Sequence, residues 1–453
     1  MYRYHLKASF DDELKTISSE ENKDISTIIT DIPMRTSVGK LRYGLQRTVD
    51  DLRKQNIYPT ETGYDAMLLG LMVYMADMRI SRDRQAQDSW SREIQLTVPI
   101  FDTRWMEYKD QFERMLKFLT GDLWSVNFIE RTVKLAEVDK NVERTDAYKT
   151  ASLFSGGMDS LIAAIDYMEK KQVTLLVSHA GESRVRHWQT GLLSIIDETY
   201  GDVRHGNAYY WTNLDGVELP DADKDMNQRS RSFLFVCIAL FAMSGTDGCT
   251  ELLIPENGLI ALNVPLDPTR IGSHSTRTTH PYYLKLWNEV IERLFGFTIR
   301  NPYWNKTKGE MAAECMNQDL LKRAIKQSFS CSSVNSASIR SRRQQHCGHC
   351  LPCIIRRAAM HRAFGSWDSS DYMYSNVTEL VNNRGSVGEQ VRSFQYAINK
   401  LKKNLDAKDS LIHIPGPLEM NDDYLGELAD TYYRGLMEVD QWIQDSLEKE
   451  NAD

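Results

Sequence analysis

The stretch YKTASLFSGGMDS, residues 148–160, decides how the whole sequence is interpreted. Its first part, Tyr148–Phe154, predicts a short strand, and after the two glycines Leu161, Ile165 and Met168 mark one face of a helix. Glycines let backbone N–H groups approach an anion closely, and the start of a helix adds unpaired N–H groups and a positive dipole end. A strand, a glycine turn and a helix in this order therefore predict a phosphate-binding site.

The six residues of the turn carry the groups that this site needs. Ser155 and Ser160 are hydroxyl donors, and Asp159 could hold Mg²⁺ on the phosphates or shape the loop. A turn of this composition also begins ordinary helices, and the Gly-Lys-Ser/Thr of the familiar P-loop does not follow it. The complete pattern between a strand and a helix favours phosphate binding. The predicted nucleotide-binding residues are Ser155, Gly156, Gly157, Met158, Asp159 and Ser160.

Chemistry on a phosphate also needs positive side chains that neutralise charge in the transition state. Arg229 and Arg231 stand just before an apolar stretch, and Lys306 and Lys308 stand at the head of another expected helix. We expect Arg231 and Lys308 to be catalytic, and Arg229 to be a solvated surface charge. The predicted catalytic residues are Asp159, Ser160, Lys308 and Arg231.

The spacing of four cysteines predicts a metal site. Three of them form a Cys-x2-Cys-x2-Cys pattern, and a fourth lies sixteen residues upstream of it. Four thiolates fill a tetrahedral zinc site of the structural kind, although a set of reduced free thiols is the alternative. His349 is expected to be a bystander or a group that contacts the ligands without binding the metal, and Cys237 and Cys315 are expected to be buried thiols. The predicted zinc ligands are Cys331, Cys347, Cys350 and Cys353.

The sequence around these cysteines is basic, with no acidic residue between Asp319 and Asp368. Some of its arginines, among them Arg356 and Arg357, could offset the thiolate charge, and others could bind an anionic substrate, phosphate or RNA. The segment Ser330–Arg343 is rich in serine and arginine, which is compatible with a mobile loop or with a binding role.

Periodicity divides the 453 residues into three expected regions. Residues 1–146 predict an α+β extension, with a helix over Trp105–Leu119. Residues 147–365 alternate strands such as Val173–Val177 with helices such as Ser232–Ser244, which predicts an α/β domain with a doubly wound parallel sheet. Residues 366–453 predict a helical region, with helices over Val387–Leu405 and Asp423–Leu447.

Composition limits the functional classes. A net charge of −8 argues against generalised nucleic-acid binding, although a local basic patch is compatible with it. No apolar run approaches the roughly 20 residues that span a bilayer, and the N-terminal residues do not resemble a signal peptide. We therefore expect a cytoplasmic protein that does not associate with membranes and whose cysteines stay reduced.

The glycine turn, the four cysteines and the Arg356–Arg357 pair together resemble the 7-cyano-7-deazaguanine synthase (QueC) family of PP-loop ATP pyrophosphatases. The resemblance covers about residues 148–365 and includes the segments Arg231–Phe235 and Lys306–Glu310. It implies the PP-loop, adenine nucleotide alpha hydrolase-like fold, with ATP, Mg²⁺ and Zn²⁺ as cofactors. It also implies a C–N bond-forming ligase that cleaves ATP to AMP and pyrophosphate, adenylates a carboxylated 7-deazaguanine and lets ammonia attack.

The sequence departs from this family in two segments. The residues Ser178–His187 and Pro255–Pro281 differ from the usual substrate-binding segments, and the chain is much longer than usual. The extended architecture resembles QatC, the QueC-like component of Qat anti-phage defence systems, which implies a companion protein of the defence operon (QatB-like) and a 7-deazaguanine-like small molecule. The alternatives are ligation of the deazaguanine to a partner-protein amine, a tRNA-modifying PP-loop enzyme, and a nucleotide-binding scaffold of a defence complex.

Overall fold

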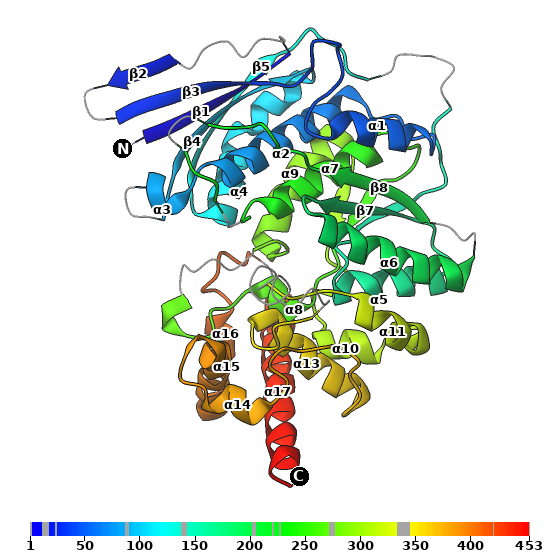
Figure 1. Ribbon diagram of the computed structural model, residues 1–453, viewed down its shortest axis with the longest axis vertical. Coiled ribbons are helices and arrows are strands. Elements are labelled where there is room, and N and C mark those ends of the chain that lie inside the picture. Colours follow the sequence, from blue (N-terminus) through cyan, green and yellow to red (C-terminus); the bar gives the residue numbers. More distant parts are fainter. Residues whose placement is uncertain are drawn as a thin grey trace.

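The computed structural model describes residues 2–10, 18–22, 25–86, 90–136, 143–201, 205–219, 222–225, 228–270, 277–332, 345–419 and 421–452. Two five-stranded sheets and their helices make up the upper part of the molecule in Figure 1, and the C-terminal helices form the lower part. None of the described helices is both long and apolar enough to cross a membrane.

The first sheet has the strand order β2-β3-β1-β4-β5, and only β2 is antiparallel to its neighbour. Its strands are β1 (Tyr2–Ser9), β2 (Ser18–Asn22), β3 (Ile25–Pro33), β4 (Glu93–Ile100) and β5 (Leu123–Glu130). Its helices are α1 (Leu45–Arg53), α2 (Glu61–Arg79), α3 (Arg82–Gln85), η1 (Thr103–Tyr108) and α4 (Lys109–Thr120). The prediction of an α+β extension is therefore wrong. Parallel strands need crossover connections, and helices between β3, β4 and β5 supply them.

The second sheet is parallel throughout, with the order β10-β9-β6-β7-β8. Its strands are β6 (Thr150–Leu153), β7 (Thr174–Ala180), β8 (His205–Trp211), β9 (Glu251–Leu253) and β10 (Thr298–Arg300). Its helices are α5 (Met158–Glu169), α6 (Ser183–Tyr200), α7 (Arg231–Met243), α8 (Gly258–Leu262), η2 (Pro268–Arg270) and α9 (Pro281–Phe295). The prediction of an α/β fold is confirmed, and this order is compatible with a doubly wound sheet.

The order of this sheet identifies where a ligand would bind. The chain runs from β6 to β7 and β8 on one side, and then returns to place β9 and β10 on the other side. The strand order therefore reverses between β6 and β9. In open α/β sheets, ligands bind outside the carboxyl ends of the strands at such a switch point.

Helices α2 and α7 pack closely between the two sheets (Figure 1). Two glycines of α2 permit this contact, because a Cβ atom on Gly70 would lie 2.6 Å from the Cβ of Cys237, and one on Gly63 would lie 2.1 Å from the Oγ of Ser244. Both helices are buried on almost all faces, and they share one apolar core with the two sheets. The position of α7 is therefore fixed by the N-terminal sheet as well as by its own.

The C-terminal helices form a separate apolar cluster around the long helix α17 (Asp422–Ala452). The helices α13 (Leu351–Phe364), α14 (Val377–Asn382), α15 (Ser386–Lys403) and α16 (Ala407–Leu411) contribute to this cluster. The helices α10 (Lys308–Ala313), α11 (Gln318–Ala324) and η3 (Ile325–Gln327) instead share an apolar cluster with α5 and α6. Glu438 of α17 accepts hydrogen bonds from the Oγ1 of Thr307 and the backbone N–H of Gly309. This carboxylate therefore holds the first turn of α10, where Lys308 lies.

A buried network of charges joins the first sheet to the segment before α7. Arg82 and Arg92 each lie 2.6 Å from the carboxylate of Asp122, and both also pair with Asp77. Asp225 pairs with Arg82 at 3.1 Å. The second oxygen of Asp77 accepts a hydrogen bond from the N–H of Ser230, at 2.8 Å. Buried charges of this kind are tolerated because each has partners of opposite sign.

We expect Asp122→Asn to lower the free energy of unfolding by about 3–5 kcal/mol, because it leaves the positive charge of Arg82 and Arg92 undercompensated in the interior. The matched control is Asp223→Asn, which breaks an exposed pair with Arg84 and should cost about 0–1 kcal/mol. Urea denaturation followed by tryptophan fluorescence measures both, and equal effects would contradict a structural role for the network.

Candidate functional site

The glycine turn joins the end of β6 to the start of α5, as its sequence predicts. Gly156 has a φ of 84°, in the left-handed region that favours glycine, and a Cβ atom there would lie 3.2 Å from the Cγ of Gln189. The amide of Gln189 donates to the carbonyls of Ser155 and His179, at 3.3 and 3.2 Å. Gln189 therefore fixes the turn against the end of β7, a role that its sequence position in α6 did not indicate.

The two serines of the turn lie next to each other. The Oγ of Ser160 donates to the carbonyl of Gly157 at 3.0 Å, and the Oγ atoms of Ser155 and Ser160 are 3.3 Å apart. The N–H of Gly157 donates to the Oγ of Ser155, at 3.3 Å. Both hydroxyls line a cavity of about 310 Å³ at the carboxyl ends of β6 and β9, which is the switch point of the sheet.

Asp159 points to the other side of the turn. Its Oδ1 lies 3.0 Å from the Nζ of Lys308, and its Oδ2 accepts a hydrogen bond of 2.8 Å from the side-chain amide of Asn257. Asp159 and Lys308 are nearly buried, and neither lines the cavity. In this arrangement the carboxylate shapes the loop by tying α5 to α10 and to the segment after β9.

The cavity has three walls of different chemistry. Ser155 and Ser160 form the wall of the turn, Arg229, Arg231 and Phe235 come from α7 and the residues before it, and Pro255 and Glu256 follow β9. The structure thus brings together the turn and Arg231, two features that the sequence analysis singled out separately.

Arg231 is the basic residue best suited to an anionic ligand. Its Nη2 donates a long hydrogen bond of 3.4 Å to the carbonyl of His179, and its guanidinium lies over the ring of Phe235. Burial lowers the pKa of Arg231, and none of the described ion pairs includes it. A partly exposed guanidinium that lines the cavity and makes no direct ion pair is suited to a phosphate or a carboxylate.

The expectation that Arg229 is a solvated surface charge is wrong. Arg229 is 9% exposed, donates a 2.7 Å hydrogen bond to the carbonyl of Thr120, and lies over the ring of Trp90. Burial, with the neighbouring Arg82, lowers its pKa to about 10. The end of α4 and Trp90, which precedes β4, cover this residue, and the local sequence does not reveal these contacts. Lys306, by contrast, pairs with Glu314 away from the cavity.

Glu256 is a cavity residue that the sequence analysis did not single out. Burial is the main cause that raises the pKa of its carboxyl to about 7, with a smaller contribution from Asp159. The Oγ1 of Thr279 donates a hydrogen bond to it, which acts in the opposite direction. Glu256 lies three residues after β9, and this position could have identified it. Side chains at the carboxyl end of a switch-point strand face the ligand crevice.

A second cavity, larger at about 570 Å³, lies between α9 and the start of α17. Trp304 and Tyr424 stack at its edge with ring centroids 4.1 Å apart. It contains none of the catalytic or nucleotide-binding residues predicted from the sequence. We therefore regard the smaller cavity at the glycine turn as the candidate active site.

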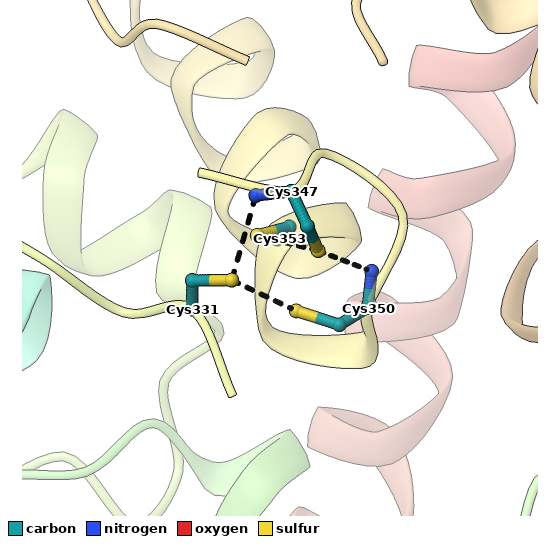
Figure 2. A group of neighbouring side chains, drawn as sticks. All are labelled: Cys331, Cys347, Cys350 and Cys353. Atoms are coloured by element: carbon teal, nitrogen blue, oxygen red, sulfur yellow. Dashed lines mark hydrogen bonds between the residues drawn. The ribbon is translucent and has the colours of Figure 1, made fainter. Parts of the chain in front are cut away.

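The four predicted metal ligands meet in one buried cluster (Figure 2), and their sulfur atoms all lie within 4.8 Å of one another. The sulfurs of Cys331 and Cys350 are 3.8 Å apart, and those of Cys347 and Cys353 are 3.9 Å apart. A tetrahedron with Zn–S bonds of about 2.3 Å has edges of about 3.8 Å. The cluster could therefore hold a metal such as zinc.

The local backbone supports this geometry. The N–H of Cys347 donates to the sulfur of Cys331, and the N–H of Cys350 donates to the sulfur of Cys347, at 3.4 and 3.3 Å. Gly348, with a φ of 87°, makes the sharp turn between them. Such N–H donors stabilise thiolates, the form in which cysteine binds a metal.

Neither neighbouring histidine completes the cluster. His349 packs edge-on against Tyr374 and is not one of the converging ligands, but its hydrogen bond with the side chain of Cys347 raises its pKa, so it contacts a ligand. His346 is stacked on Phe329, and its Nδ1 lies 4.0 Å from the sulfur of Cys353. The spacing of the cysteines alone was thus sufficient to identify the ligand set.

The cluster is connected to the glycine turn through two residues. Phe329 donates its backbone N–H to the carbonyl of Gly156 at 2.9 Å, and the Oγ of Ser330 accepts the N–H of Met158 at 3.3 Å. Cys331 follows directly in the sequence. The ring of Phe329 stacks on Trp188, and both pack against the cysteines. A filled cluster would therefore hold the turn in place as well as its own loop.

The arginines after the cluster have structural partners. Arg356 is fully buried and donates to the hydroxyl of Ser328 and the carbonyl of Ile325, at 2.9 and 2.8 Å. Arg357 donates to the carbonyl of Tyr374 at 3.1 Å. Both are thus engaged within the protein rather than directed to a ligand. Most of the expected Ser330–Arg343 loop, from residue 333 on, lies outside the described residues.

The three remaining cysteines are buried thiols outside the cavity. Burial raises the pKa of Cys249 and of Cys315 to about 12, and raises that of Cys237 as well. Reactive cysteines have lowered pKa values and partial exposure. Since no cysteine lines the cavity, a mechanism that needs a thiol pair there has little support.

Comparison with protein-family models and with curated proteins finds no match to this chain.

We expect the protein to contain one equivalent of zinc, and Cys350→Ser to lose it, because three remaining thiolates bind zinc far more weakly than a closed set of four. Cys315→Ser removes a buried thiol outside the cluster and is the matched control. Elemental analysis after gel filtration measures the metal, and an unchanged content in Cys350→Ser would contradict the assignment.

Proposed function

We propose that this protein uses ATP to adenylate a carboxylate of the 7-deazaguanine type, releases pyrophosphate, and passes the activated carbonyl to a nitrogen nucleophile, in the setting of anti-phage defence. The observation that carries the proposal is the cavity at the sheet switch point, where Ser155 and Ser160 of the glycine turn face Arg231. The resemblance to the PP-loop pyrophosphatases and to QatC supplies the reaction and the setting.

The chemistry explains why such a cavity is needed. A carboxylate is a poor electrophile because its leaving group would be oxide, whereas an acyl adenylate releases AMP. The protein has to position the two anions and neutralise their charge. The start of α5 and the serine hydroxyls support phosphate binding, and Arg231 supports binding of a second negative group.

The volume and walls of the cavity support a substrate of modest size. About 310 Å³ is at the lower end of small-molecule sites. The ring of Phe235 offers an apolar surface for a flat heterocycle, and Gln228, just before α7, offers hydrogen-bonding groups. Mg²⁺ would accompany the phosphates of ATP, and the cysteine cluster would hold Zn²⁺ in a structural role.

The first test incubates the protein with ATP and 7-carboxy-7-deazaguanine, with ammonium chloride or with a companion protein of the same operon. AMP and pyrophosphate should form only when the carboxylate is present, and a nitrile or amide product, or a mass increase on the companion protein, identifies the nucleophile. No AMP under any of these conditions would exclude the proposed reaction, and a nucleotide-binding scaffold would then remain.

We expect Arg231→Ala to lower kcat/KM for AMP formation by about 10²–10³-fold, because it removes the unpaired positive charge at the cavity wall. Arg231→Lys should recover part of the rate, since it keeps the charge but loses the planar fork. Arg300→Ala, which removes an exposed arginine paired with Glu251, is the control and should leave the rate unchanged. Steady-state assays of AMP release decide the comparison.

A further inference from the structure

The position of Glu256 is fixed by residues that lie far from it in the sequence. Its backbone is tied to Asn301, whose amide donates to the carbonyl of Glu256 at 2.7 Å and whose Oδ1 accepts its N–H at 3.3 Å. Its side chain accepts from Thr279 and lines the same cavity as Ser155 and Ser160. Asn301 therefore fixes the backbone of Glu256, and Thr279 holds its carboxyl group at the ligand space.

Lys308 acts on the Glu256 carboxylate at longer range and lowers its pKa slightly, but the direct ion pair of Lys308 is with another carboxylate. Lys308 is engaged by Asp159 at 3.0 Å, and Arg229 and Arg231 belong to the opposite wall. None of the described ion pairs includes Glu256. A structural carboxylate in the interior is normally paired with a cation, so this one is available to exchange a proton with a ligand.

We propose that the Glu256 carboxylate is the general base of the second half-reaction, which removes a proton from the nitrogen nucleophile before it attacks the acyl adenylate. The inference rests on the proposed function and assigns a step of it. An ammonium ion or a protein ammonium group has no lone pair, so it has to lose a proton before a C–N bond can form. The acidity of the group fits the task, since burial raises the pKa of Glu256 to about 7, near the value at which a general base works best at neutral pH.

Atoms, charge and electron pairs are all accounted for in this step. Glu256 takes one proton from the ammonium nitrogen, and the nitrogen lone pair forms a bond to the carbonyl carbon of the adenylate. The bond between that carbon and the phosphate oxygen then breaks, and AMP departs with the electron pair. The nitrogen then loses a second proton to AMP or to water, which leaves a neutral amide product. No oxidant or reductant is needed.

The decisive variant is Glu256→Gln, which keeps the size of the side chain and an oxygen that can accept from Thr279. With ATP, 7-carboxy-7-deazaguanine and ammonium chloride, we expect pyrophosphate to form at nearly the wild-type rate. We expect the transfer of ammonia, measured in a single turnover, to fall by about 10²–10⁴-fold. Hydroxylamine is unprotonated at neutral pH and needs no base, so it should restore transfer in the variant.

Two further variants separate catalysis from structure. Glu251→Gln makes the same change at the other end of β9, in a pair with Arg300, and should leave both half-reactions unchanged. Thr279→Val keeps the carboxylate but removes a hydrogen bond that lowers its pKa, so transfer should persist with its midpoint moved to higher pH.

The pH profile of the wild-type enzyme gives an independent test. The base form of Glu256 predominates above its pKa, so single-turnover transfer should rise through about pH 7 and level off above it, while transfer in Glu256→Gln should follow the fraction of free ammonia and keep rising without this plateau. A flat wild-type profile between about pH 6 and 8 would overturn the inference even if the variant fails to fold.

The outcomes distinguish the two proposals. If the wild-type protein forms no pyrophosphate, the proposed function fails and the inference falls with it. If the wild-type protein is active and Glu256→Gln transfers ammonia equally well, only the inference fails. An equal loss of pyrophosphate formation and of transfer, with no rescue by hydroxylamine, would show that Glu256 only maintains the shape of the cavity.

Discussion

The close contact between α2 and α7 is the constraint on which the candidate site depends. Gly63 and Gly70 allow the two helices to approach so closely that any side chain at either position would overlap α7. Because α7 begins at Arg231, this contact and the Asp77–Ser230 hydrogen bond set how far the guanidinium stands from the glycine turn. The N-terminal region, whose role its sequence did not indicate, thus supports one wall of the cavity.

The opposite wall depends on the cysteine cluster. Phe329 and Ser330 bind the backbone of the glycine turn, and the next residue is a cluster ligand. A phosphate site built from backbone N–H groups works only if those groups are fixed before the ligand arrives. The cluster and the turn are therefore two parts of one rigid unit, although Cys331 and Gly156 are far apart in the sequence.

The features that the sequence predicted well are those with short-range patterns. The apolar runs gave the positions of β7 and α7, and the cysteine spacing gave a cluster whose sulfurs converge. The features it missed depend on contacts between distant segments. Asp159 and Asn257, for example, are 98 residues apart, and Arg229 is covered by Trp90 and by the end of α4.

The error in the first region has the same origin. Three strands come first in the chain and helices separate them from β4 and β5, but a local pattern does not state whether neighbouring strands run in the same direction. Similarly, periodicity over Trp105–Leu119 indicated one helix, whereas the chain forms η1 and then α4. Glu256 was overlooked because its importance follows from the strand order, which brings the end of β9 beside that of β6.

The contact between Glu438 of α17 and the start of α10 affects the order in which the site forms during synthesis of the chain. Lys308 reaches Asp159 from the first turn of α10, and that turn is held by a residue 129 positions further along the chain. A nascent chain therefore carries the glycine turn, the cysteines and Arg231 out of the ribosome before the group that steadies Lys308 has been made. Incomplete chains lack these contacts, so the loop around this turn is finished only in proteins whose last long helix has docked.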